Sequence, residues 1–110
     1  ISAETGEVEV QFEGKPEFGN PIGHIQGGIL AAMLDDTMGP AVGCMLAPGE
    51  FAPTLNLNIS FERPAKVGTL IGKARVSKRG RQACFVSGAL YQDGVQVATA
   101  TATTLVQRLE

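Results

Sequence analysis

The sequence predicts an α+β domain in which one curled antiparallel sheet surrounds one long helix. Apolar and polar residues alternate near the N-terminus and again through most of residues 54–106, as expected for strands with one buried face. Between these regions, residues 27–47 place apolar side chains at helical spacing. One strand, one helix and then four strands therefore predict a helix packed against a single antiparallel sheet.

The first strand is expected over residues 6–13, where Val8, Val10 and Phe12 alternate with polar side chains. The segment that follows, residues 14–24, is rich in glycine and proline and predicts a loop. This loop leads directly into the helical pattern, so its conformation sets where the helix begins.

The helix is expected to begin at Gly27 and to end near residues 46–47, before Pro48. Pro40 should kink or divide it, because proline lacks the N–H that a helix interior uses. Small residues fill many of the positions between the apolar ones. A helix with so little side-chain bulk is expected to be covered by the sheet on several sides.

Four alternating stretches follow the helix, at residues 54–64, 68–80, 82–94 and 95–106. The first is the clearest, because Leu55, Leu57, Ile59 and Phe61 alternate with polar residues. Short turns join the last three stretches, which predicts an antiparallel meander.

Length and composition exclude several classes of protein. The 110 residues, 44% of them hydrophobic, suit one folded domain, expected over residues 1–110. The net charge of −2 offers no basic field for nucleic acid. No apolar run reaches the roughly 18 residues of a membrane span and no signal peptide opens the chain, so we expect a soluble, cytoplasmic protein without a membrane partner.

Cys44 and Cys84 are expected to be buried free thiols.

Gln26, Gly27 and Gly28 form an elbow directly before the helix. The first N–H groups of a helix have no partner within it, and the helix dipole makes this end electropositive. Since the two glycines carry no side chain, a substrate oxygen can approach these donors, which makes a candidate oxyanion hole. Asp35 lies eight positions after Gly27 near the same face, whereas Asp36 lies about 100° around the helix. These residues indicate a carboxylate facing an anion site at a helix end.

Plainer interpretations of the same residues stay open. A Gly-Gly pair before a helix is often only a turn, and helical aspartates are often solvated. His24, the only histidine, fits local hydrogen bonding within its loop. No second His, Cys or cluster of acids completes a metal site, and no Ser-His-Asp set is evident, so no metal is expected.

Three stretches together resemble the hotdog-fold acyl-CoA thioesterases, in the branch related to the phenylacetyl-CoA and 4-hydroxybenzoyl-CoA thioesterases. They are the loop NPIGHIQGG, the helix ILAAMLDDTMGPAVG and the strand TLNLNISFERPAKVG. The strongest marker is an Asn followed after five residues by an HGG-like elbow and then by an Asp. The last two strands extend the resemblance over nearly the whole chain, which implies a hotdog fold and hydrolysis of a thioester to a free acid and coenzyme A.

The resemblance also implies roles for individual residues. The helix acid of the family is the general base or nucleophile, and Asp35 takes its place. The N–H of the first elbow glycine, here Gly27, would bind the thioester oxygen, and Asn20 would orient the water or the thioester. Thr54, supplied by a partner subunit, would position the attacking water or the acid.

One position departs from the family pattern. Gln26 stands where the family usually has histidine; its side chain can donate a hydrogen bond but cannot shuttle a proton. A histidine occurs two residues earlier, as His24, and it can either compensate near the substrate or only structure the loop. Both roles of His24 stay open.

An acyl-CoA substrate carries phosphates that need cations, so coenzyme A is expected as part of the substrate and no separate cofactor is expected. The basic residues that can supply the cations are Arg63, Lys66, Lys78, Arg79 and Arg81. The candidates for the acyl pocket are Met33, Met38, Leu55 and Leu57. Gly28 would leave room for the substrate beside the elbow.

The resemblance further implies that two sheets pair edge to edge in a homodimer with its sites at the interface, and that two dimers form a homotetramer. The small core independently favours self-association. Two alternatives stay open: a hotdog hydratase or dehydratase, whose catalytic histidine His24 does not match, and a non-catalytic acyl-CoA binding module, which Gln26 makes conceivable. The set of Asn20, Gly27, Asp35 and Thr54 favours the thioesterase.

Overall fold

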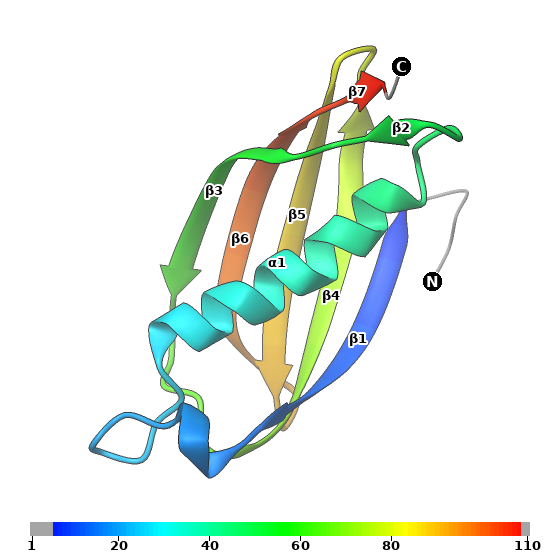
Figure 1. Ribbon diagram of the computed structural model, residues 1–110. Helices are drawn as coiled ribbons and strands as arrows, with labels where there is room; N and C mark the ends of the chain where they lie inside the picture. The colour runs from blue at the N-terminus through cyan, green and yellow to red at the C-terminus, as the bar shows by residue number, and fades with distance from the viewer. Residues whose placement is uncertain (1–5, 109–110) are drawn as a thin grey trace.

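The computed structural model describes residues 6–108, which form one long helix, one short 3-10 helix and seven strands (Figure 1). In chain order the elements are β1 (Glu7–Gly14), η1 (Pro16–Phe18), α1 (Gly27–Gly43), β2 (Glu50–Phe51), β3 (Thr54–Phe61), β4 (Gly68–Arg79), β5 (Ala83–Gln92), β6 (Val95–Leu105) and β7 (Gln107–Arg108).

The main sheet has five strands in the order β1-β4-β5-β6-β3, and all of its neighbours pair antiparallel. Strands β4, β5 and β6 are sequential neighbours, so the predicted meander is confirmed. Helix α1 crosses one face of this curved sheet (Figure 1), while β2 and β7 form a separate two-stranded pair. The expected α+β architecture is therefore confirmed, with β1 and β3 as the two edges of the main sheet.

The elements differ from the sequence prediction in a few places. The helix is not divided at Pro40, because this proline lies in the last turn on the exposed side and the helix ends at Gly43. The short elements η1, β2 and β7 were not predicted, since two or three residues are too few to show a period. Cys84 is buried as expected, but Cys44 is only partly buried.

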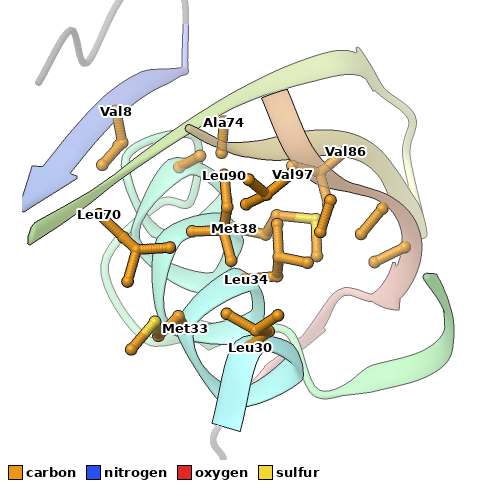
Figure 2. Packing of buried hydrophobic residues seen from close by; sticks show 14 of the residues in the cluster. Val8, Leu30, Met33, Leu34, Met38, Leu70, Ala74, Val86, Leu90 and Val97 are labelled. Atoms are coloured by element: carbon orange, nitrogen blue, oxygen red, sulfur yellow. The ribbon is translucent and has the colours of Figure 1, made fainter. Parts of the chain in front are cut away.

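The core lies between α1 and the sheet. Figure 2 shows Leu34 and Met38 of the helix beside Leu90 and Val97 of the sheet. Two glycines allow this close packing. A Cβ atom on Gly88 of β5 would stand 2.9 Å from Met38 Cγ, and one on Gly72 of β4 would overlap the Thr37 hydroxyl. The buried Thr37 hydroxyl donates to the Met33 carbonyl at 2.7 Å, so it needs no partner in the sheet.

The opposite face of α1 is open in the single chain. Apart from Pro40, its exposed residues are small or acidic: Gly27, Gly28, Ala32, Asp35, Asp36, Gly39 and Gly43. The expectation that the sheet covers the helix on several sides is therefore wrong for one chain. The small residues mark a bare outward face, and the two acids lie on it.

Candidate active site

The loop before α1 is held together by Asn20. Its Oδ1 atom accepts hydrogen bonds from the backbone N–H groups of Ile22 at 3.1 Å and His24 at 3.0 Å. Its own backbone N–H donates to the His24 carbonyl at 2.6 Å. Asparagine forms such turns because its short side chain reaches backbone donors a few residues ahead. Since both bonds use Oδ1, the Nδ2 group stays available as a donor to another molecule.

The end of the same loop is hydrogen-bonded to η1 on one side and to the segment between β3 and β4 on the other. The backbone N–H of Gln26 donates to the Phe18 carbonyl at 2.9 Å, and that of Ile25 donates to the Ala65 carbonyl at 2.8 Å. A further bridge joins His24 to Lys66. These contacts fix the elbow next to the segment that follows β3, so the start of the helix does not depend on the loop alone.

Helix α1 begins at Gly27, and no side chain caps its first turn. The carbonyl of Gln26 accepts from Ile29 and Leu30, whereas the N–H groups of Gly27 and Gly28 precede the first intrahelical donors. Both glycines are exposed. The helix start therefore presents two backbone donors in the electropositive field of the helix dipole, as the sequence predicted.

Phe61, the last residue of β3, packs beside this helix start. A Cβ atom added to Gly27 would lie 3.3 Å from the Phe61 ring, whereas one added to Gly28 would meet nothing within 4 Å. Sequence reasoning did not single out Phe61. The period-two pattern of β3 does place it on the same face as Leu57 and Ile59, which is the face toward the helix.

Asp35 and Asp36 lie near the middle of α1, and both side chains are exposed. The Cα atom of Asp35 stands about 12 Å along the helix axis from that of Gly27, at 1.5 Å per residue. Side chains on a helix tilt toward its N-terminus, which shortens the gap between the Asp35 carboxylate and the elbow. The acid and the backbone donors thus share one open surface without touching each other.

Thr54 begins β3, and a β-bulge sets its direction. Thr54 pairs with Thr104 of β6 and Asn56 pairs with the adjacent Thr103. Leu55 is therefore an extra residue of β3 without a partner in β6, which is a β-bulge. Without the bulge, Thr54 and Asn56 would point to the same face. With it, Thr54 turns to the helix side, together with the buried Thr104.

Thr54 and the elbow lie at opposite ends of β3. The seven steps from Thr54 to Phe61 span about 23 Å in an extended strand, and Phe61 is the end that reaches Gly27. One chain therefore does not bring Thr54 to its own helix start. The role implied by the resemblance, in which a partner subunit supplies this threonine, stays a prediction.

The predicted basic residues fall into two groups at opposite ends of the helix. Arg63 and Lys66 belong to the segment beside the elbow, and Arg63 Nη1 donates to the Gln96 carbonyl at 3.0 Å. Arg79 lies near the helix C-terminus, where its Nη2 is 3.2 Å from Glu50 Oε1 and its Nε donates to the Met45 carbonyl at 3.3 Å. Lys78 and Arg81 flank it.

The apolar candidates also differ in their surroundings. Met33 and Met38 are buried in the core, whereas Leu55 is 62% exposed at the bulge and Leu57 is partly buried. In the single chain, only the two leucines of β3 are accessible to a ligand.

Two hollows on the surface of residues 6–108 are of ligand size, and neither is lined by Gly27, Asp35 or Thr54. One, of about 700 Å³, lies on the outer face of the sheet over β1, β4, β5 and β6. The other, of about 540 Å³, lies between the C-terminal part of α1 and β2. The candidate catalytic groups thus sit on an open surface of the single chain rather than in either hollow.

Within residues 6–108, no cluster of three or more His, Cys, Asp or Glu side chains could hold a metal ion. No helix in this part of the chain is long and apolar enough to cross a bilayer.

A helix crossing a curled antiparallel sheet, with a bare glycine elbow and an outward acid, defines a hotdog-type protein. The family model described as the thioesterase superfamily matches residues 22–99, a stretch that includes the elbow, α1 and β3. The chain belongs to this superfamily. The family expected from the sequence motifs is thus confirmed, and so is the fold.

Individual relatives agree with this assignment. The structure of a phenylacetic acid degradation-related protein from Ralstonia eutropha JMP134 is 48% identical, covers 96% of this chain and 80% of its own, and superposes with a TM-score of 0.92. A Bacillus halodurans protein solved with CoA is 35% identical, covers 91% of this chain and 67% of its own, and has a TM-score of 0.87. Human acyl-coenzyme A thioesterase 13 is 32% identical over 90 residues, which are 79% of this chain and 62% of that protein. The chain therefore spans 62% of the length of this curated relative.

Proposed function

We propose that the protein is an acyl-CoA thioesterase, which hydrolyses a thioester to a free acid and coenzyme A. The observation that carries the proposal is the open helix face, which presents both the N–H groups of Gly27 and Gly28 and, further along the helix, the carboxylate of Asp35. The similarity to an acyl-coenzyme A thioesterase and to a protein solved with CoA supports the same class of substrate.

The proposed mechanism uses the electropositive helix start at Gly27 and the negatively charged carboxylate of Asp35. The thioester carbonyl oxygen binds the Gly27 N–H, which stabilises the negative charge that develops on that oxygen. Asp35 takes a proton from a water molecule, and the water oxygen forms the new bond to the carbonyl carbon. The carbon–sulfur bond then breaks, and the thiolate leaves and takes up the proton. Alternatively, Asp35 attacks the carbon directly and water hydrolyses the resulting anhydride.

Gln26 and Asn20 would orient the reactants. The Gln26 side chain does not cap the helix, so its amide is available to donate to the thioester oxygen. The Asn20 Oδ1 is used within the loop, which leaves Nδ2 to orient the water or the thioester. Both residues act as hydrogen-bond donors, and neither needs to transfer a proton.

A second copy of the chain would complete the site through the β3 edge. Edge strands that must stay unpaired are usually protected by charge. Edge strand β1 carries Glu7, Glu9 and Glu13, whereas β3 carries no charged residue. Leu55 and Phe61 of β3 are also 62% and 53% exposed. We therefore expect β3 to pair with β3 of a second copy in a homodimer, the unit from which the implied homotetramer would be built.

Such pairing would bring the missing threonine to the elbow. A two-fold axis near the middle of β3 sets the start of one strand against the end of the other. Thr54 of the partner subunit would then come next to Phe61, and hence to Gly27. Leu55 of the partner subunit would arrive beside it and offer an apolar contact to the acyl group.

The CoA phosphates need a cationic site at some distance from the thioester, because the pantetheine arm separates the two. Arg63 and Lys66 are both exposed on the segment that follows β3 and is bonded to the loop. Arg79 is engaged with Glu50 and Met45 at the other end of the helix. Of the two basic groups, the pair Arg63 and Lys66 is therefore the better candidate for the nucleotide, with His24 next to it.

The first test is thiol release from short, medium, long and aryl acyl-CoAs by the wild type and two variants. Asp35→Asn should lower turnover by about 10²–10⁴-fold, the usual contribution of a positioned base, while acyl-CoA binding persists. Asp36→Asn is the matched control and should keep wild-type turnover, because Asp36 is also exposed but lies about 100° around the helix from Asp35. Loss of turnover in Asp36→Asn but not in Asp35→Asn would show that the catalytic acid is Asp36 rather than Asp35. Tight acyl-CoA binding without turnover by the wild type would instead support the binding module.

A further inference from the structure

Thr104 of β6 has a buried hydroxyl group that the fold does not use. The residue is only 3% exposed, and its Oγ1 atom has no hydrogen-bond partner among the described residues. Buried polar atoms are nearly always paired, and leaving one unpaired destabilises the folded state relative to an apolar group of the same shape. Valine would fill the same space without this penalty, so a packing role does not explain the hydroxyl.

The neighbours of Thr104 show where a partner can come from. On one side it pairs with Cys84 of β5, which is fully buried and lies within the core. On the other side it pairs with Thr54 of β3, which is exposed at the sheet edge. The bulge at Leu55 turns Thr54 to the helix side of the sheet, which is the side that Thr104 occupies.

Directly opposed residues of an antiparallel pair have their Cβ atoms about 4.5–5.5 Å apart, a spacing at which threonine pairs form hydrogen bonds. Rotation about χ1 of either residue brings the two hydroxyls within reach, and a hydroxyl both donates and accepts. The unused Thr104 hydroxyl therefore lies next to the one edge residue that the proposed reaction needs in a fixed orientation.

We propose that Thr104 is a positioning residue for Thr54. The buried Thr104 hydroxyl holds the Thr54 hydroxyl in the rotamer that faces the active site of the partner subunit, where Thr54 orients the attacking water or the acid. The inference rests on the proposed thioesterase function. It adds a residue that does not touch the substrate and acts only through Thr54.

The test compares steady-state kinetics and thermal unfolding of Thr104→Val, Thr104→Ser and Thr103→Val. Thr104→Val should lower kcat about tenfold, the effect of losing one orienting hydrogen bond, with KM within about twofold of wild type. Its unfolding midpoint should change little, because the one bond lost is to the exposed Thr54 and the cost of burying a hydroxyl is removed with it. Thr104→Ser keeps the hydroxyl and should restore kcat. Thr103→Val, on the next residue of β6 but on the outer face, should behave as wild type.

A double-variant cycle tests whether Thr104 acts through Thr54. If it does, the pair Thr54→Val with Thr104→Val should be no slower than Thr54→Val alone. Additive losses, or a kcat of Thr104→Val equal to that of Thr103→Val, would overturn the proposal. So would a large fall in the unfolding midpoint of Thr104→Val, because the hydroxyl would then be structural. A wild type that hydrolyses no acyl-CoA would instead refute the proposed function itself, and the positioning role with it.

Discussion

Gly88 of β5 lies directly beneath Met38 of α1, so close that a Cβ atom on the glycine would stand 2.9 Å from Met38 Cγ. Gly72 and Thr37 make a similar contact one strand away. These two glycines set the depth at which the helix sits on the sheet. Because the helix is pressed close along this face, its other face, with Asp35, is fixed outward.

This contact predicts opposite effects for two glycine substitutions. Gly88→Ala should destabilise the fold by about 1–3 kcal/mol, because the added methyl group overpacks a filled core. Gly39→Ala, on the exposed face of α1 with nothing within 4 Å of its Cβ position, should stabilise it by about 0.5–1 kcal/mol, the helix preference of alanine over glycine. Denaturant unfolding at one protein concentration measures both. Equal effects would contradict the packing described.

The two edges of the sheet predict a difference in assembly. Asn58→Lys places a charge at the middle of β3, where two copies of it would face each other across the proposed two-fold axis and repel. Since Asn58 is exposed, the single chain should tolerate the change. Gln11→Lys makes the matched change on edge strand β1.

Light scattering should show that Asn58→Lys lowers the mass of the assembly and that Gln11→Lys leaves it unchanged. Turnover should fall in parallel for Asn58→Lys alone. A β3 variant that keeps both its mass and its activity would exclude this edge as the subunit interface.

The two basic groups predict separate kinetic and stability effects. Arg63→Gln should raise KM for acyl-CoA several-fold with little change in kcat, because it would weaken uniform binding of the nucleotide. Arg79→Gln should instead lower the free energy of unfolding by about 1–3 kcal/mol, since its bonds to Glu50 and to the Met45 carbonyl are lost.

Kinetics and denaturant unfolding on both variants distinguish the two roles. A raised KM in Arg79→Gln at unchanged stability would transfer the phosphate site to the helix C-terminus.

The presence of glutamine at position 26 predicts that this position must donate a hydrogen bond and need not transfer a proton. Gln26→Ala should lower kcat by about tenfold, as expected for one lost hydrogen bond to the thioester oxygen. Gln26→His restores a donor and should recover most of the rate. The pH profile of kcat compared between wild type and Gln26→His is the control: a new ionisation that governs the rate would show that histidine adds a proton shuttle.

The sequence was most informative where a period or a glycine acts locally. Alternation in Leu57, Ile59 and Phe61 predicted β3, and the glycine elbow predicted the helix start at Gly27, because both patterns express a local backbone preference. The family was predicted from motifs in the same segments. The roles of Asp35, Gly27, Asn20 and Thr54 stay predictions.

What the sequence did not show depends on contacts between distant segments. The open face of α1 was not predicted, since small residues suit a surrounded helix and a bare helix face equally well. The burial of Met33 and Met38 is set by where α1 lies on the sheet. The direction of the Thr54 side chain depends on the bulge at Leu55. The alternating pattern within one strand does not reveal a register shift relative to the neighbouring strand.

The uncharged edge of β3 has a consequence for mixtures of defective chains. If β3 joins two copies, each site takes Asp35 from one chain and Thr54 from the other. A chain carrying Asp35→Asn and a chain carrying Thr54→Val, each impaired alone, then form mixed pairs in which one of the two sites is whole. Random mixing makes half of the pairs mixed, so about a quarter of all sites recover. Two faulty copies of the gene would complement each other, as no pair of defects in a self-contained monomer can.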